Sequence, residues 1–331
     1  MTTARTARNA RTARRGPAAP PTAPGPGAAP PVRTDVVLLA VAIAGISLSA
    51  PLTATIAAPA LAIAFWRNAM AVGALTPLAL VRHRGELRGM GRRAVLLSLA
   101  AGVLLAVHFA VWLPSLRMTS VASSTALVTT TPIWTTLLLR LRGHRPPALV
   151  WAGTGLAFLG VVILTGVDFA VSARALAGDA LALAGGIAAA GYVLLGAEVR
   201  RTVGTVAYTY VLYVTTTVLL LGTCLLSGAS LGGYSGGTWL KLALLTVTAQ
   251  LLGHSLINRV VKGLGPSVTS TAILLETPGA ALIAALWLNQ LPPAAAYPAL
   301  LVILAGLALV IRGDRLPRAR LEEPATATRS A

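Results

Sequence analysis

The chain has 331 residues, of which 56% are hydrophobic and only 11% are charged. About a quarter of the residues of a typical soluble domain are charged, so this shortage excludes an ordinary soluble protein and indicates a lipid-facing surface. The formal net charge of +18 first suggests a nucleic-acid partner. However, the basic residues lie in the tails and in short gaps between apolar runs, which argues against nucleic-acid binding.

Residues 1–34 consist mainly of Ala, Thr, Pro and Arg and contain no acidic residue. A segment of this composition cannot bury a hydrophobic core, so we expect it to be disordered. It also lacks the apolar region of a signal peptide ahead of the first long apolar run. We therefore expect 1–34 and 313–331 to be cytoplasmic tails.

From residue 36 onward, apolar runs alternate with short polar breaks. About 20 apolar residues are needed to cross a bilayer as a helix. The predicted fold class is therefore an all-α integral membrane protein with ten transmembrane helices. The expected spans are 36–58, 60–81, 95–114, 120–140, 148–167, 178–198, 205–227, 239–257, 267–288 and 294–311.

The distribution of the 27 lysine and arginine residues predicts the orientation. Most of them fall in the tails and in every second gap between spans. The other gaps hold only Arg117, Arg174 and Lys241, and Arg67 lies inside a span. Because basic residues are enriched on the cytoplasmic side, we expect both termini in the cytoplasm and a multi-pass protein of the cytoplasmic membrane.

An internal repeat divides the chain into two halves at a constant offset of 146 residues. The matching pairs are Gly45 with Gly191, His108 with His254, Ser124-Thr125-Ala126 with Ser270-Thr271-Ala272, and Thr131-Pro132 with Thr277-Pro278. Each half, 35–168 and 175–312, has five expected spans. An odd number makes the second half enter the membrane upside down, which is the inverted-topology repeat of secondary transporters.

Pro132 and Pro278 fall inside the fourth and ninth expected spans. Proline removes a backbone hydrogen bond and kinks or breaks a helix. Interrupted helices at corresponding positions of two inverted halves indicate a binding site near the midplane. Simple packing kinks are an equally good reading of the pattern.

The chain resembles the drug/metabolite transporter superfamily, of the EamA-domain type. The resemblance is carried by AFWRNAMAVGALTPLAL (64–80), TSVASSTALVTTTPIWTTLLL (119–139) and GHSLINRVVKGLGPSVTSTAILLETPGAALIAALWLNQ (253–290). It implies a transporter of small metabolites, often an exporter. Family members often carry a glutamate after each of the fourth and ninth spans, where this chain has His144 and Gln290.

Ionisable side chains within the membrane are functional candidates by default. Glu276 is the only acidic residue deep in an expected span, and the repeat relates it to Thr130. Arg67 is expected close enough in height to contact Glu276 in at least one state. His108 and His254 are expected toward opposite faces, where they would relay a proton or bind substrate. The alternative reading is a set of buried groups with structural partners only.

A stripe of polar residues recurs every four positions along the eighth span and comprises Thr246, Gln250, His254 and Asn258. Lipid cannot satisfy these groups, so the stripe faces protein or water. A water-lined pathway and hydrogen bonds between helices explain it equally well. Trp112 is a candidate for the wall of a binding pocket, although packing or membrane-interface anchoring explains a single aromatic residue as well.

The function predicted from these features is secondary transport, by alternating access, of a small organic metabolite out of the cell, with protons as the expected driving ion. The rivals are a membrane-embedded enzyme acting on a lipid or acyl substrate, and a structural or channel-like protein. The sequence has no phosphate-binding loop and no metal-binding motif, so no enzyme activity, cofactor or metal is expected. The expected partners are the substrate and the lipid bilayer; the sequence leaves open whether the chain forms a homodimer.

Overall fold

The computed structural model describes residues 32–119, 121–165, 172–288 and 296–314. All regular secondary structure in these ranges is helical. Six continuous helical stretches are long and apolar enough to cross a membrane within the described residues: 33–54, 60–82, 92–115, 173–199, 205–227 and 236–273. The tails expected over 1–34 and 313–331 lie almost entirely outside the described residues.

The first half contributes eight helical elements. These are α1 (Val32–Ser47), α2 (Ser49–Ala54), α3 (Ala60–Arg82), α4 (Arg84–Gly89), α5 (Arg92–Ser115), α6 (Val121–Val128), α7 (Thr131–Leu141) and α8 (Ala148–Thr165). The second half contributes seven: α9 (Ala173–Val199), α10 (Thr205–Ser227), α11 (Gly236–Leu245), the π-helix η1 (Thr246–His254), α12 (Ser255–Ile273), α13 (Glu276–Leu288) and α14 (Ala296–Asp314).

The expected spans correspond to these elements with four differences. The first span is divided at Leu48 between α1 and α2. The fourth span is broken into α6 and α7, and the ninth is broken between α12 and α13. The eighth extends beyond residue 257 because α11, η1 and α12 are continuous. The turn between the eighth and ninth spans lies inside α12 at Gly265, whose φ of 78° is left-handed, and Pro266 follows it. Glycine adopts this conformation without strain, so the chain reverses here without a long loop.

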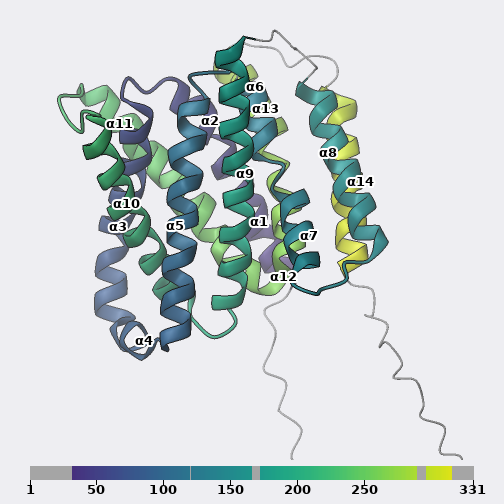
Figure 1. The fold of residues 1–331 in the computed structure, drawn as a ribbon, viewed down its shortest axis with the longest axis horizontal. Helices are drawn as coiled ribbons and strands as arrows, with labels where there is room; N and C mark the ends of the chain where they lie inside the picture. Colours follow the sequence, from purple (N-terminus) through teal and green to yellow (C-terminus); the bar gives the residue numbers. More distant parts are fainter. Residues whose placement is uncertain (1–31, 120, 166–171, 289–295, 315–331) are drawn as a thin grey trace, which may run out of the picture.

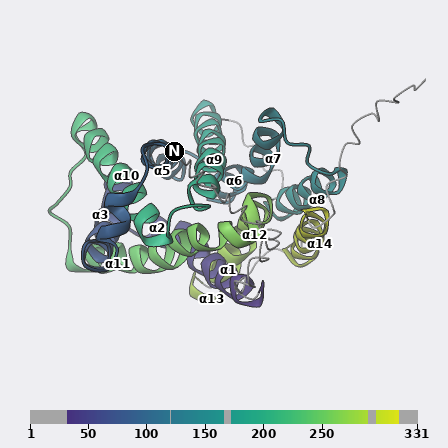
Figure 2. The ribbon, with the colours of Figure 1, turned by 90° about the horizontal axis from the view of Figure 1, so that it is seen from below.

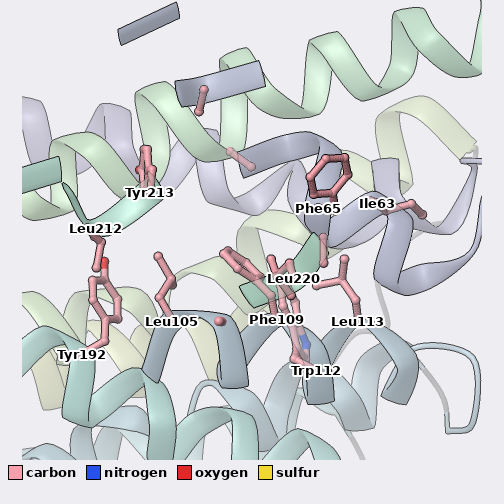
Figure 3. Packing of buried hydrophobic residues seen from close by; sticks show 14 of the residues in the cluster. Ile63, Phe65, Leu105, Phe109, Trp112, Leu113, Tyr192, Leu212, Tyr213 and Leu220 are labelled. Carbon is pink, nitrogen blue, oxygen red and sulfur yellow. The ribbon is translucent and has the colours of Figure 1, made fainter. Parts of the chain in front are cut away.

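The helices form a layered bundle in which the hydrophobic core lies between α3, α5, α9 and α10 (Figure 1). Figure 3 shows side chains of this core, among them Phe65 of α3, Phe109 of α5 and Leu220 of α10. At the other end of the bundle, α8 and α14 pack as a close pair (Figure 1). A side-chain carbon added at Gly306 would lie 2.6 Å from the Gly153 carbonyl oxygen, so only glycine allows this approach. Close backbone contact of this kind replaces the hydrophobic driving force that lipid removes between membrane helices.

The elements of the two halves pair by the 146-residue offset: α5 corresponds to the eighth span, and α6 with α7 corresponds to the ninth. In the view from below, α12 lies near the centre of the molecule, while α7 lies at its edge beside α9 (Figure 2). This end carries α4 and the C-terminal ends of α7 and α9 (Figure 1). The turn at Gly265 belongs to the same end, because Gly265 lines one cavity with Arg93 and Arg142. We call it the inner end, because the basic gaps of the sequence gather there.

Candidate functional site

Two helix breaks meet in the centre of the molecule. Pro132 lies at the start of α7 and Pro278 lies in the first turn of α13, so neither ring disrupts the helix that follows it. The Thr129 and Thr277 hydroxyls, one beside each break, lie 3.4 Å apart. The break in the first half is lined by threonines whose hydroxyls donate back to carbonyl oxygens one turn earlier, as in Thr129 to Thr125 at 2.9 Å. Such bonds satisfy backbone groups that water would otherwise have to reach.

Thr130 belongs to this break but does not line the small cavity that lies between the two breaks. Its hydroxyl donates to the Leu127 carbonyl at 2.7 Å and accepts from the Trp134 indole nitrogen at 3.0 Å. The backbone of Gly186 on α9 packs against the same residues, because a side-chain carbon at Gly186 would lie 2.8 Å from the Val128 carbonyl oxygen. The hydrogen bonds of Thr130 therefore hold the break in shape.

A small cavity of about 30 Å³ lies between the two breaks and the helices α1, α5, α9 and η1. This volume accommodates about one water molecule. The cavity is therefore contracted, and a metabolite could enter it only if the surrounding helices separate. Its polar and aromatic lining consists of Ser49, His108, Trp112, Thr129, Thr131, Tyr192, His254 and Glu276.

The two histidines of the repeat lie on the same cavity. Their ring centroids are 6.3 Å apart, and the rings meet edge to face. His108 is held by the Gly185 carbonyl at 3.0 Å from Nδ1 and by stacking on Trp112 at 5.4 Å between centroids. Among the described residues, the buried Nδ1 atom of His254 has no hydrogen-bond partner. The expectation that the two histidines lie toward opposite faces is not what the structure shows, because both rings line the same cavity.

Arg67 is fully buried on α3 beside this cavity. Its Nε donates to Gln250 Oε1 at 2.9 Å, and its Nη1 donates to Ser49 Oγ at 3.1 Å. Gln250 Nε2 in turn donates to Asn68 Oδ1 at 2.9 Å. The guanidinium carbon also lies 4.5 Å from the Phe109 ring centroid, a cation–π contact. Two polar side chains and one ring thus contact the buried guanidinium, and its Nη2 has no partner within the described part of the chain.

Glu276 occupies the first turn of α13 and is 6% exposed. A negative charge is stabilised at this position by the partial positive charge of the helix N-terminus. Among the described ion pairs, none joins Glu276 to Arg67, the partner that the sequence suggests. Ser49 connects them indirectly, because it binds Arg67 and lines the same cavity as Glu276.

The polar stripe of the eighth span faces protein along its length, and most of it lies on the π-helix η1. Thr246 is buried next to Met70, with 3.6 Å between hydroxyl and sulfur. Asn258 accepts a hydrogen bond from the Tyr192 hydroxyl at 3.1 Å. Only His254 of the stripe lines the cavity. Most polar side chains of the stripe therefore form contacts with neighbouring helices and do not line the cavity. π-Helical turns such as η1 are frequent at functional sites.

Contacts between the two halves close the molecule on both sides of the cavity. On the outer side, Trp66 Nε1 donates to the Leu231 carbonyl at 2.9 Å, and Lys241 Nζ donates to the Thr55 carbonyl at 2.9 Å. On the inner side, Arg93 pairs with Glu198 at 3.1 Å. The Glu86 carboxylate also accepts a hydrogen bond from the Gly204 backbone nitrogen.

Arg200 reaches from the inner end toward the cavity wall. Its Nε donates to the Asn258 backbone carbonyl at 3.0 Å, and the Asn258 side chain accepts from Tyr192, which lines the cavity. Burial is the main cause that lowers the pKa of the Arg200 guanidinium, and the neighbouring positive charge of Arg259 adds to it. Asn258 therefore joins the buried Arg200 to the cavity wall.

Comparison with known proteins decides the family. Residues 36–166 and 176–312 each match the EamA-like transporter family, so the match covers most of the chain in two copies. The chain belongs to the EamA-like transporter family. It is accordingly a membrane transporter of the drug/metabolite type rather than an enzyme, and the resemblance seen in the sequence is confirmed.

Solved structures share the fold of this chain. One crystal structure, titled only "Crystal structure of protein", superposes with a TM-score of 0.67 at 18% sequence identity, over 86% of this chain and 99% of its own. At this identity the likeness shows the fold alone. A comparison with curated proteins gives no match.

Several residues of the site were not predicted from the sequence. Ser49, Asn68 and Tyr213 are ordinary polar residues within apolar runs. Ser49 binds Arg67, Asn68 binds the Gln250 side chain, and Tyr213 binds the Gln250 backbone carbonyl. The signal that would have found Asn68 is its position next to Arg67, since a buried charge requires polar neighbours. Among the described residues, no group of three or more His, Cys, Asp or Glu is placed to hold a metal ion.

Proposed function

We propose that this family member exports a small organic metabolite across the cytoplasmic membrane by alternating access, and that it is driven by protons. The observation that carries the proposal is the polar cavity between the two paired helix breaks. It is bordered by both halves and brings together Glu276 and the two repeat-related histidines. Transporters built from inverted repeats bind substrate at such an interface, between broken helices near the midplane.

The mechanism follows from what holds the halves together. In the contracted state, hydrogen bonds between the halves close the outer side through Lys241 and Trp66 and the inner side through Arg93 and Glu86. Breaking one set while keeping the other would open the cavity to one side only. A rocking motion of this kind requires only that the two sets break alternately.

Glu276 is the proposed proton carrier. It is the only acidic residue among those that line the cavity, and it sits at a helix N-terminus that stabilises its charged form. Opening and closing change how much water reaches this carboxyl. A carboxyl that is hydrated in one state and buried in the other binds and releases a proton as the protein cycles.

We also propose the orientation that the charges indicate, with both termini cytoplasmic. The repeats are proposed to extend over 35–168 and 175–312, between cytoplasmic tails. The homodimer left open by the sequence forms no part of this proposal, because the mechanism requires one chain only.

The test begins with identifying the substrate. Metabolites in the medium of cells that overproduce the wild type are compared with those from cells that overproduce Glu276→Gln at equal membrane abundance. The metabolite enriched only by the wild type is then labelled and tested for counterflow in proteoliposomes, with protein-free liposomes as control. Saturable counterflow is expected; its absence for every enriched metabolite would contradict transport by this chain.

A further inference from the structure

A second and much larger cavity lies at the inner end of the molecule, separate from the central one. It has a volume of about 640 Å³ and lies between the inner ends of α5, α7, α9 and α12. Figure 2 views this end and shows α7 at the periphery of the bundle, near α9. The charged or titratable residues of its lining are Arg93, Arg142, His144, Glu198, Arg201 and Lys262.

The charge of this inner cavity is strongly positive. Its one acidic residue, Glu198, is already paired on both oxygens, with Arg93 at 3.1 Å and with Arg201 at 3.3 Å. Arg142 and Lys262 form no ion pair with the acidic residues that the structure describes. Two cationic side chains therefore line the cavity without a counter-charge from the residues that the structure describes.

The remaining surface of the inner cavity is apolar. Leu97, Leu139 and Val261 contribute to its lining beside the basic residues. On α7, Leu137 and Leu141 are 37% and 73% exposed. Basic residues next to an apolar wall that continues onto exposed leucines of a membrane helix match an amphiphile better than they match a soluble anion.

We propose that the inner cavity binds the phosphate headgroup of an anionic phospholipid, with an acyl chain lying along α7. Basic pockets between membrane helices on the cytoplasmic side recognise such headgroups, and juxtamembrane basic residues contribute to their binding. The site is distinct from the central cavity but adjoins it: Val193 and Ile257 line the central cavity, while Leu194 and Val261 line the inner one. A bound lipid thus contacts the helices that form the inner closure.

The proposal is tested on the purified full chain in neutral detergent, by native mass spectrometry and by thermal unfolding. The lipids are cardiolipin, phosphatidylglycerol and, as the zwitterionic reference, phosphatidylcholine; sodium phosphate is the soluble reference. The pocket variant is Arg142→Gln with Lys262→Gln. The matched control is Arg82→Gln with Arg88→Gln, which removes the same charge from the same end of the molecule but outside the cavity lining.

The anionic lipids are expected to bind the wild type and the control equally and to raise their unfolding temperature. The pocket variant should bind them about thirtyfold more weakly, while its unfolding temperature without lipid stays unchanged. Equal lipid binding by the pocket variant and the control would overturn the proposal, as would equal stabilisation by phosphatidylcholine. Stabilisation by sodium phosphate to the same extent would show a soluble-anion site instead.

Discussion

His108 and His254, which the internal repeat relates to each other, lie edge to face across one cavity with 6.3 Å between their ring centroids. Their surroundings differ despite the repeat. His108 is anchored by the Gly185 carbonyl and by Trp112, whereas His254 Nδ1 has no partner among the described residues and its ring packs against Phe109. The two halves thus place the same residue type at one point but hydrogen-bond Nδ1 in only one of the two copies that the structure describes.

This difference predicts unequal effects of removing the two histidines. His108→Ala loses a buried hydrogen bond and a stacking contact, so it should destabilise the protein by about 1–3 kcal/mol. His254→Ala should destabilise it less, because the substitution removes an unsatisfied buried nitrogen, and should instead change the KM for the exported metabolite. Unfolding temperatures in detergent and transport kinetics measure the two effects. Equal losses of stability would show that His254 is as firmly anchored as His108.

Glu276→Gln should separate proton coupling from substrate movement. The amide keeps the shape of the side chain but cannot exchange a proton, so transport driven by a pH gradient should be lost while counterflow is partly retained. Glu322→Gln, which changes an acidic residue of the expected tail 313–331, is the control and should keep the pH-driven transport. A wild-type dependence on the pH gradient in Glu276→Gln proteoliposomes would reduce this carboxyl to a structural role.

Arg67 and Gln250 should behave as one energetic unit. Arg67→Ala leaves Gln250 Oε1 and Ser49 Oγ without their buried donor. Gln250→Ala leaves Arg67 Nε without its acceptor and Asn68 Oδ1 without its donor. The double variant should therefore lose less stability than the sum of the two single losses, with a coupling of about 1–3 kcal/mol. Unfolding measurements on all four proteins give the coupling directly. Additive losses would mean that the hydrogen bond contributes nothing.

The proposed orientation predicts which thiols are accessible in intact cells. Gly232 and Gly85 are exposed, and a side-chain carbon at either meets open space. In a Cys224→Ala background, Gly232→Cys should react with a membrane-impermeant reagent in intact cells, whereas Gly85→Cys should react only after permeabilisation. The reversed pattern would show that the orientation is the opposite of the proposed one. Labelling of both thiols in intact cells would place them on the same side of the membrane, which an odd number of spans between them does not allow.

The sequence predicts the helices well because each apolar run must cross lipid, and it predicts both breaks because proline leaves few alternatives. It does not predict the π-helix, since a polar residue at every fourth position fits an α-helix equally well. It also misplaces the histidines relative to each other. Counting residues along a helix gives a height but carries no information about how helices cross.

The contacts around Arg67 could not be predicted from the sequence either. Both Arg67 and Gln250 stand out in the sequence as polar groups inside apolar spans, yet they lie 183 positions apart and nothing in the pattern joins them. The sequence suggests Glu276 as the partner of Arg67 because its charge is opposite, but the structure pairs Arg67 with Gln250 and Ser49. Partner choice between buried polar groups depends on tertiary packing, which a single sequence does not contain.

The contracted central cavity has a thermodynamic consequence. Its 30 Å³ is far below the roughly 300–1,000 Å³ of sites that hold small molecules, so in the proposed transport mechanism substrate binds only to the fraction of molecules in an expanded conformation. The apparent dissociation constant is then the intrinsic one divided by that fraction. The bond from Lys241 to Thr55, which touches no ligand, therefore contributes to the affinity that a binding experiment records: weakening it enlarges the competent population and tightens binding.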